Sequence, residues 1–149
     1  MRKQDHFRIA TVDAREPCLL HITFGDGVIM TVDLATIIER IPALAPLKDP
    51  KLFGKARVGD WGWTVDWIPG ELDMAGDNLR AEAVEQSGGI SHERIWEWMH
   101  RNGLTLETAA VALGISRRML AYYRSGQKPI PRHIWLACVG WEAERHKAA

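Results

Sequence analysis

The chain has 149 residues, 46% hydrophobic and 26% charged, which is typical of a globular protein with one ordinary domain or two small ones. It has no apolar run of about 18 residues and no signal-peptide pattern, so we expect a cytoplasmic protein without membrane contact. Residues 1–88 hold 10 Lys and Arg against 14 Asp and Glu (net −4), whereas residues 89–149 hold 9 against 5 (net +4). This asymmetry predicts that the second half meets a polyanion.

The first quarter of the chain alternates apolar runs with turn residues, which predicts strands. Residues 7–12 and 18–24 are expected to form two of them. Asp26-Gly27 favours a two-residue hairpin turn with positive φ, leading into a returning strand over residues 28–34. These residues therefore predict an antiparallel hairpin.

The segment that follows mixes short helices with a second hairpin. Residues 35–40 predict a short helix or turn, and residues 45–53 a loop that ends in one helical turn. Residues 56–58 and 63–68 predict a strand pair, and residues 73–85 a helix. The N-terminal portion is thus expected to be a small α+β domain of two β-hairpins with short helices.

Three tryptophans, Trp61, Trp63 and Trp67, lie close together in this portion. A tryptophan cluster can bind a flat ligand, but small domains also use tryptophan to gain buried area or to pack against a partner. We favour core or partner packing and keep the ligand cage as the alternative.

A set of short motifs spans roughly residues 7–82: Asp26-Gly27, Asp33-Leu34, Pro46-Leu47, Asp49-Pro50, Leu52-Phe53 and Trp67. By these motifs the N-terminal portion resembles a small bacterial domain family of undefined function. The resemblance implies a compact α+β domain without catalytic residues. It also implies an antitoxin-like or regulatory role, because such domains are often encoded near toxin-like genes and some are fused to a helix-turn-helix module.

A polar stretch with a glycine pair, residues 85–91, has the composition of a linker. We therefore expect two domains, residues 1–87 and residues 88–149. The first serves dimerisation, partner binding or sensing. The second begins with a helix over residues 91–102.

Two short helical patterns follow in residues 104–131. Thr105 and Ser116 are suitable N-caps, and Gly114 breaks the pattern between them. Two short helices joined by a tight glycine turn form a helix-turn-helix, whose second helix presents its first turn to the DNA major groove. That first turn carries Arg117 and Arg118, with no acid expected to oppose them. Residues 128–131, with two prolines, predict an extended spacer before a last helix over residues 133–146.

This second domain resembles the DNA-binding domain of the phage lambda repressor/Cro family, the XRE-type helix-turn-helix. The match covers most of residues 91–142 and rests on Gly103-Leu104-Thr105, Ala110, Leu113-Gly114-Ile115-Ser116, Arg117-Arg118, Tyr123, Ser125-Gly126 and Lys128-Pro129-Ile130-Pro131. Leu106 departs from the family pattern, because many relatives carry a phosphate-binding glutamine there. The resemblance implies an all-α, lambda-repressor-like helical domain.

Contact roles follow by position from this resemblance. The residues expected to touch bases are Arg117, Arg118, Tyr122 and Met119. Arginine makes a bidentate pair with guanine, and phosphate contacts position the protein without specifying sequence. The residues expected to touch phosphates are Thr105, Arg124, Lys128 and Arg132.

These observations predict a sequence-specific DNA-binding transcriptional regulator that acts as a homodimer on double-stranded DNA, in the manner of an autoregulating antitoxin. The alternative is a protein-interaction module that binds a toxin or another small protein, with the helical domain serving assembly only. We expect no enzymatic activity and no cofactor, because the chain has no Walker loop, G-x-S-x-G or H-E-x-x-H motif. No metal site is expected either, because no histidine or cysteine set has metal-ligand spacing.

Overall fold

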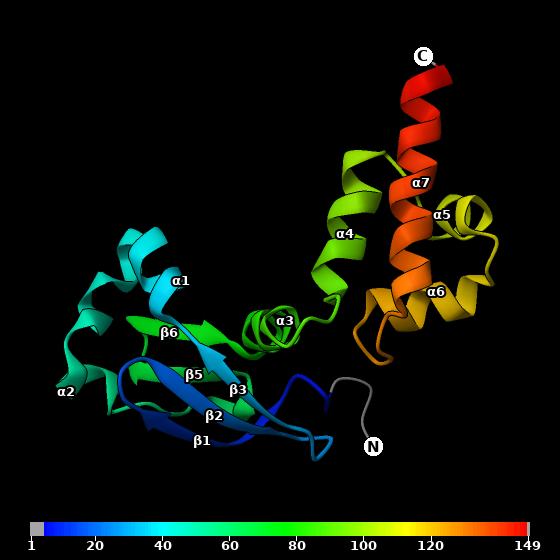
Figure 1. Ribbon diagram of the computed structural model, residues 1–149. Helices are drawn as coiled ribbons and strands as arrows, with labels where there is room; N and C mark the ends of the chain where they lie inside the picture. The colour runs from blue at the N-terminus through cyan, green and yellow to red at the C-terminus, as the bar shows by residue number, and fades with distance from the viewer. Residues whose placement is uncertain (1–4, 149) are drawn as a thin grey trace. The chain divides into compact units, whose positions relative to one another are not determined.

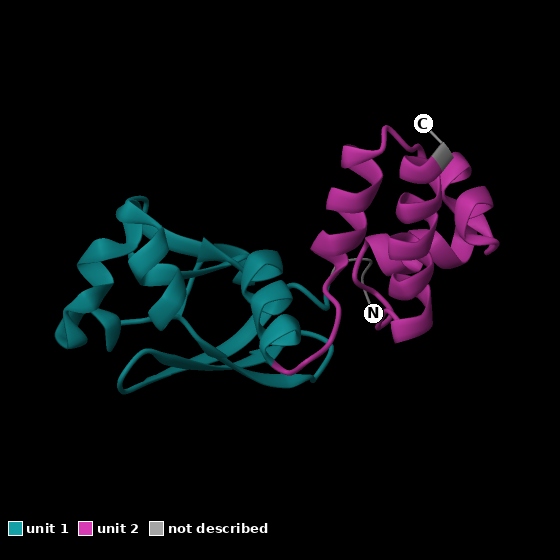
Figure 2. Cartoon of the chain, turned by 45° about the horizontal axis from the view of Figure 1, so that its top comes forward, with its two compact units in different colours: residues 1–86 teal, residues 87–149 magenta. Residues whose placement is uncertain are grey.

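The structure is a computed structural model that describes residues 5–148. The chain forms two compact units, residues 1–86 and residues 87–149, which Figure 2 shows in teal and magenta. The boundary predicted from the linker lies one residue later, after residue 87. The N-terminal unit mixes strands and helices, and the C-terminal unit contains helices in its described part.

The N-terminal unit contains two three-stranded antiparallel sheets (Figure 1). In each sheet the strands are adjacent in the order in which they follow along the chain. The first sheet consists of β1 (Ile9–Arg15), β2 (Leu19–Phe24) and β3 (Ile29–Asp33). The second sheet consists of β4 (Arg57–Val58), β5 (Thr64–Ile68) and β6 (Leu72–Ala75).

The helices of this unit are short except for the last one. They are α1 (Ala35–Arg40), the 3₁₀ helix η1 (Pro42–Lys48), α2 (Pro50–Phe53), the 3₁₀ turn η2 (Asp60–Gly62) and α3 (Gly76–Gln86). Helix α3 packs against β3 and β6, one strand from each sheet. At its end the Gln86 side-chain amide forms two 2.8 Å hydrogen bonds with the backbone N–H and C=O of Asp33, which satisfies this part of the outer edge of β3.

The expectation of an α+β unit agrees with this architecture, and both expected hairpins are present, each within a sheet of three strands. The third strand of the first sheet is β1, where residues 7–12 were expected to form a strand, whereas the third strand of the second sheet, β6, was not expected. The sequence of β6, Leu-Asp-Met-Ala, consists mostly of good helix formers and was expected to lie at the start of the next helix. Pairing of β6 with β5 overrides that local preference, because strand formation depends on cross-strand neighbours more than on intrinsic propensity.

One hydrophobic core is shared by both sheets of the N-terminal unit. Its fully buried members include Leu20, Phe24, Val32, Val65 and Leu79. Trp67 belongs to this core, and its indole Nε1 donates to the carbonyl of Phe53 at 3.0 Å.

The other two tryptophans are not part of that core. Trp61 is 79% exposed and Trp63 is 43% exposed. The guanidinium of Arg8 lies over the Trp63 ring, and its Nε donates to the Trp61 carbonyl at 2.9 Å. The three tryptophans therefore do not line one flat-ligand cage: one is a core residue and two lie on the surface.

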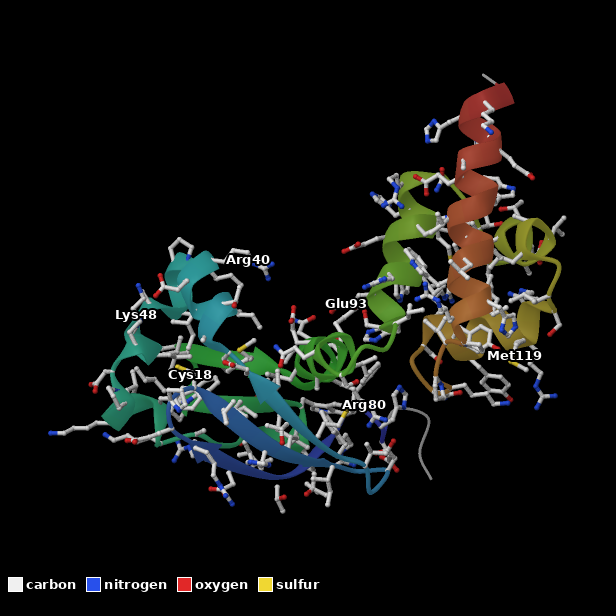
Figure 3. The ribbon with its side chains drawn as sticks, in the orientation of Figure 1. Cys18, Arg40, Lys48, Arg80, Glu93 and Met119 are labelled. Atoms are coloured by element: carbon white, nitrogen blue, oxygen red, sulfur yellow. The ribbon has the colours of Figure 1, made fainter. Side chains whose placement is uncertain are left out.

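The β2–β3 turn is held by both its own residues and α3. Gly27 has φ +86°, and Asp26 accepts from the backbone N–H of Val28 at 3.2 Å. Arg80, labelled on α3 in Figure 3, forms an ion pair with Asp26 and donates to the carbonyl of His6 at 2.7 Å. The turn forms at the predicted place, but three residues, Gly25 to Gly27, lie between the hydrogen-bonded Phe24 and Val28, where a two-residue turn was expected. An arginine distant in sequence stabilises it.

The C-terminal unit consists, in its described part, of α4 (His92–Arg101), α5 (Leu106–Leu113), α6 (Arg117–Arg124) and α7 (Arg132–Ala148) (Figure 1). All four helices contribute to one core, with Ile95, Ala109, Leu120 and Cys138 fully buried. Trp98 of α4 joins α7 by donating from Nε1 to the carbonyl of Cys138 at 3.1 Å. Burial raises the pKa of the Cys138 thiol to about 12, so this cysteine acts as a core residue.

Within residues 5–148 the helices are all too short or too polar to cross a membrane.

Candidate nucleic-acid interface

The segment from α5 to α6 is built by two N-caps and one left-handed turn. The Thr105 hydroxyl accepts from the backbone N–H of Thr108, whose own side chain bonds back to the Thr105 backbone, forming a capping box. Gly114 ends α5 with φ +69°, a conformation that side chains with a Cβ rarely adopt. Ser116 then caps α6 by accepting from the N–H of Met119 at 3.1 Å. These local rules set where α6 begins.

Helix α6 has one buried face and one exposed face. Leu120 and Tyr123 are buried in the core of the unit, whereas Arg117 and Arg118 are exposed in the first turn. The first turn of α6 contains no acidic residue. Cations at the positive end of a helix do not favour helix formation, so their presence fits a role in binding an anion.

Three of the residues expected to contact DNA come together at this surface. The Nε of Arg118 donates to the Tyr122 hydroxyl at 3.0 Å, and its guanidinium carbon lies 5.7 Å from the ring centroid. Lys128, from the loop after α6, places its Nζ 4.5 Å from the centroid of the same ring. The hydrogen bond from Arg118, with the charges of Arg118 and Lys128, holds the pKa of the Tyr122 phenol below its usual value.

Arg117 is not unopposed, contrary to the expectation from its local sequence. Its Nε lies 3.8 Å from a carboxylate oxygen of Glu107 on α5. The two side chains are 66% and 79% exposed, so the ion pair is loose and solvent-screened. The local sequence around Arg117 does not predict this contact, because Glu107 lies ten positions earlier and comes near only through the α5–α6 turn.

The other four candidate residues lie in different environments. Arg124 stacks its guanidinium over the ring of Trp96 on α4, at 4.9 Å from the centroid. Arg132 is exposed in the first turn of α7. Thr105 is exposed, but its hydroxyl already serves the α5 cap. Met119, labelled on α6 in Figure 3, is half-buried and packs against the core, so only part of it is available to a partner.

Two contacts at this surface differ in how far the sequence predicts them. The Arg118–Tyr122 contact follows from i, i+4 spacing on one helix, which places the two side chains on the same face. The Arg124–Trp96 contact joins α6 to α4 and has no local signal in the sequence.

Among the residues that the structure describes, no group of three or more histidines, cysteines or acids could hold a metal ion.

No protein-family model and no curated protein matches the chain. A solved structure does: the putative DNA binding protein NE0471 from Nitrosomonas europaea ATCC 19718. The two chains share 48% sequence identity, and the alignment covers 93% of this chain and 88% of the other with a TM-score of 0.86. At this identity and coverage, the chain belongs to the same family as NE0471.

Proposed function

We propose that this chain is a sequence-specific DNA-binding transcriptional regulator whose C-terminal unit is a helix-turn-helix domain of the lambda repressor/Cro type. The observation that carries the proposal is the start of α6, where Arg117 and Arg118 stand exposed after the left-handed turn at Gly114. The name of the family member NE0471, a putative DNA binding protein, supports the DNA-binding part of this proposal. In this role α6 enters the major groove and presents its first turn to base edges.

The residues of this surface divide into those expected to contact bases and those expected to contact phosphates. Arg117 and Arg118 have the hydrogen-bonding geometry to recognise guanine. Lys128 and Arg132 are exposed cations outside α6 that suit phosphate contacts. The guanidinium of Arg124 lies over the Trp96 ring. A phosphate contact from Arg124 therefore requires that the guanidinium move off this ring or bind phosphate while it stays there.

We further propose that the protein acts as a homodimer. A single module of this size makes few phosphate contacts, and a two-fold dimer doubles them by reading two half-sites about 34–36 Å apart. The N-terminal unit, with its excess of acidic residues, would then serve dimerisation or partner binding and would limit indiscriminate binding, because its charge repels phosphate. Light scattering of the full chain with and without DNA measures the stoichiometry.

Fluorescence anisotropy with genomic duplex fragments tests the DNA-binding role. The double variant Arg117→Ala plus Arg118→Ala is expected to lose about 2 kcal/mol or more of affinity for the best fragment and most of its sequence preference. The matched control is Arg40→Ala plus Lys48→Ala, which removes the same charge from exposed positions of the N-terminal unit (Figure 3). Equal affinity of parent and Arg117/Arg118 variant would show that α6 is not the recognition helix.

A second candidate function is partner binding through the N-terminal unit, as in an antitoxin that captures a toxin. The observation that favours it is Trp61, which is 79% exposed and lies in a turn with φ 62°. Exposed tryptophans are frequent energetic centres of protein interfaces. Co-purification with the product of the adjacent gene, lost in a Trp61→Ala variant, would support this function.

A further inference from the structure

The hydrogen bond between Arg118 and Tyr122 fixes the orientation of an exposed arginine. Long exposed arginines usually sample many rotamers, and ordering one on binding costs free energy. Here Nε of Arg118 donates to the Tyr122 hydroxyl at 3.0 Å, one helical turn further along α6. The guanidinium also lies against the ring, 5.7 Å from its centroid. These two contacts therefore favour this orientation of the arginine before any partner binds.

The tyrosine ring is itself held from a second element. Lys128, in the loop after α6, places Nζ 4.5 Å from the ring centroid, and its backbone N–H lies 3.4 Å from the Tyr122 carbonyl. A cation over an aromatic face is attracted by the ring quadrupole. Contacts from α6 and from the following loop thus restrict the position of the phenol.

The hydrogen bond determines which donors remain available. It engages Nε of Arg118 and leaves the two terminal amino groups, Nη1 and Nη2, for a partner. The Tyr122 hydroxyl accepts from Arg118, so its own proton is available for donation. The guanidinium end of the pair consequently offers donors and no acceptor.

From this geometry we infer that Tyr122 is a positioning residue that presents Arg118 to a guanine, and that the pair sets a guanine preference at one position of each half-site. The inference rests on the proposed DNA-binding function. In the major groove guanine offers two acceptors, N7 and O6, which match Nη1 and Nη2. Adenine and cytosine each present an amino donor there, which a guanidinium cannot accept.

Arg117 is not oriented by a hydrogen bond to a neighbouring aromatic side chain, as Arg118 is. Its contact is the loose ion pair with Glu107 at 3.8 Å, and its side chain is 66% exposed. An arginine held this weakly can reorder toward a base or a phosphate. The guanine preference is therefore assigned to Arg118 and not shared equally between the two arginines.

The test uses the full chain and duplexes selected from a randomised library, with affinities measured at several salt concentrations. Arg118→Ala should abolish a guanine preference at one half-site position. Tyr122→Phe, which keeps the ring and removes the hydroxyl, should reduce that preference by about tenfold while leaving the salt dependence unchanged. Arg117→Ala is the comparison: it should lower the overall affinity, because Arg117 belongs to the same surface, but it should leave the preference at that position intact.

An NMR readout tests the geometry without DNA. The Nε–H proton of Arg118 should exchange slowly with water in the parent and rapidly in Tyr122→Phe, with the two proteins melting at the same temperature. If Tyr122→Phe keeps the full guanine preference, or weakens binding equally on all sequences, the positioning role is overturned and DNA binding stands. If the parent shows neither salt-dependent binding nor a preferred sequence, the proposed function itself fails.

Discussion

Arg80 of α3 and Asp26 of the β2–β3 turn form an ion pair, with 2.9 Å between Nη2 and Oδ2 and side chains only 15% and 14% exposed. Removing one charge of such a pair leaves the other poorly compensated. Asp26→Asn should therefore lower the free energy of unfolding by about 2 kcal/mol in urea titrations. Asp13→Asn is the matched control: its pair with Arg15 is also 2.9 Å long but about 60% exposed, so it should cost less than about 1 kcal/mol. Equal effects would show that burial does not strengthen the Asp26 pair.

The same pair predicts a dependence on pH. Burial pushes the pKa of Asp26 upward, but the hydrogen bonds and charge of Arg80, with the N–H of Val28, outweigh it and leave the pKa below the ordinary 3.8. A carboxyl whose folded-state pKa is lowered contributes stability above its unfolded-state pKa and loses it as the pH falls through the folded-state value. The stability difference between parent and Asp26→Asn should thus be constant above about pH 5 and shrink below about pH 4. A difference that grows on acidification would contradict the assignment.

Local signals in the sequence predicted the elements whose shape is set by their own residues. Residues 35–40 form the expected helix, and Thr105 and Ser116 cap the helices expected after them. The turn at Asp26-Gly27 also has the expected left-handed glycine. In each case a residue or its near neighbours satisfy the backbone, so the pattern alone carries the information.

Contacts between distant residues were not predictable in this way. Strand β6 exists because β5 pairs with it, and Arg80 reaches Asp26 across 54 positions. In the candidate interface, the arginines, Tyr122 and Lys128 were identified from their positions, but the Glu107 and Trp96 contacts were not. These contacts depend on how helices pack, which short-range periodicity does not specify.

Two glycines of the C-terminal unit should respond in opposite directions to alanine. An added Cβ would meet nothing within 4 Å at either Gly140 or Gly114, so sterics with neighbours do not distinguish them. Gly140 lies within α7, where alanine should stabilise the helix by about 1 kcal/mol. Gly114 has φ +69°, where alanine should cost about 1–2 kcal/mol. Thermal unfolding of the two variants measures the difference, and effects of the same sign would contradict the backbone argument.

The phenol of Tyr122 should titrate at lower pH than an ordinary tyrosine. The hydrogen bond from Arg118, followed by its charge, lowers the pKa of Tyr122. Arg118→Ala should move the titration midpoint upward, whereas Arg117→Ala should leave it nearly unchanged, because the groups that shift this pKa are Arg118 and Lys128. NMR of ¹³Cζ-labelled tyrosine separates Tyr122 from Tyr123, the other tyrosine in the chain. An unchanged midpoint in Arg118→Ala would show that the hydrogen bond is not maintained in solution.

Trp61 combines an unfavourable backbone with an exposed side chain. Within residues 5–148 it is the single non-glycine residue with positive φ, at 62°, and the indole is 79% exposed. A bulky residue in this conformation lowers the free energy of unfolding by about 1–2 kcal/mol. The exposed indole packs too little to offset this cost. Asparagine tolerates the left-handed region, so Trp61→Asn should raise the free energy of unfolding by about 1 kcal/mol.

Trp63→Asn is the control for that variant. Trp63 has φ −79° and is 43% exposed, so the substitution relieves no strain and removes the ring on which Arg8 stacks. It should therefore lower the free energy of unfolding where Trp61→Asn raises it, with both values measured by urea denaturation. A gain in stability from Trp61→Asn would mean that the indole is retained at a cost to the fold, as expected if a partner binds it. A loss would mean that Trp61 stabilises the unit itself, so that its retention needs no partner.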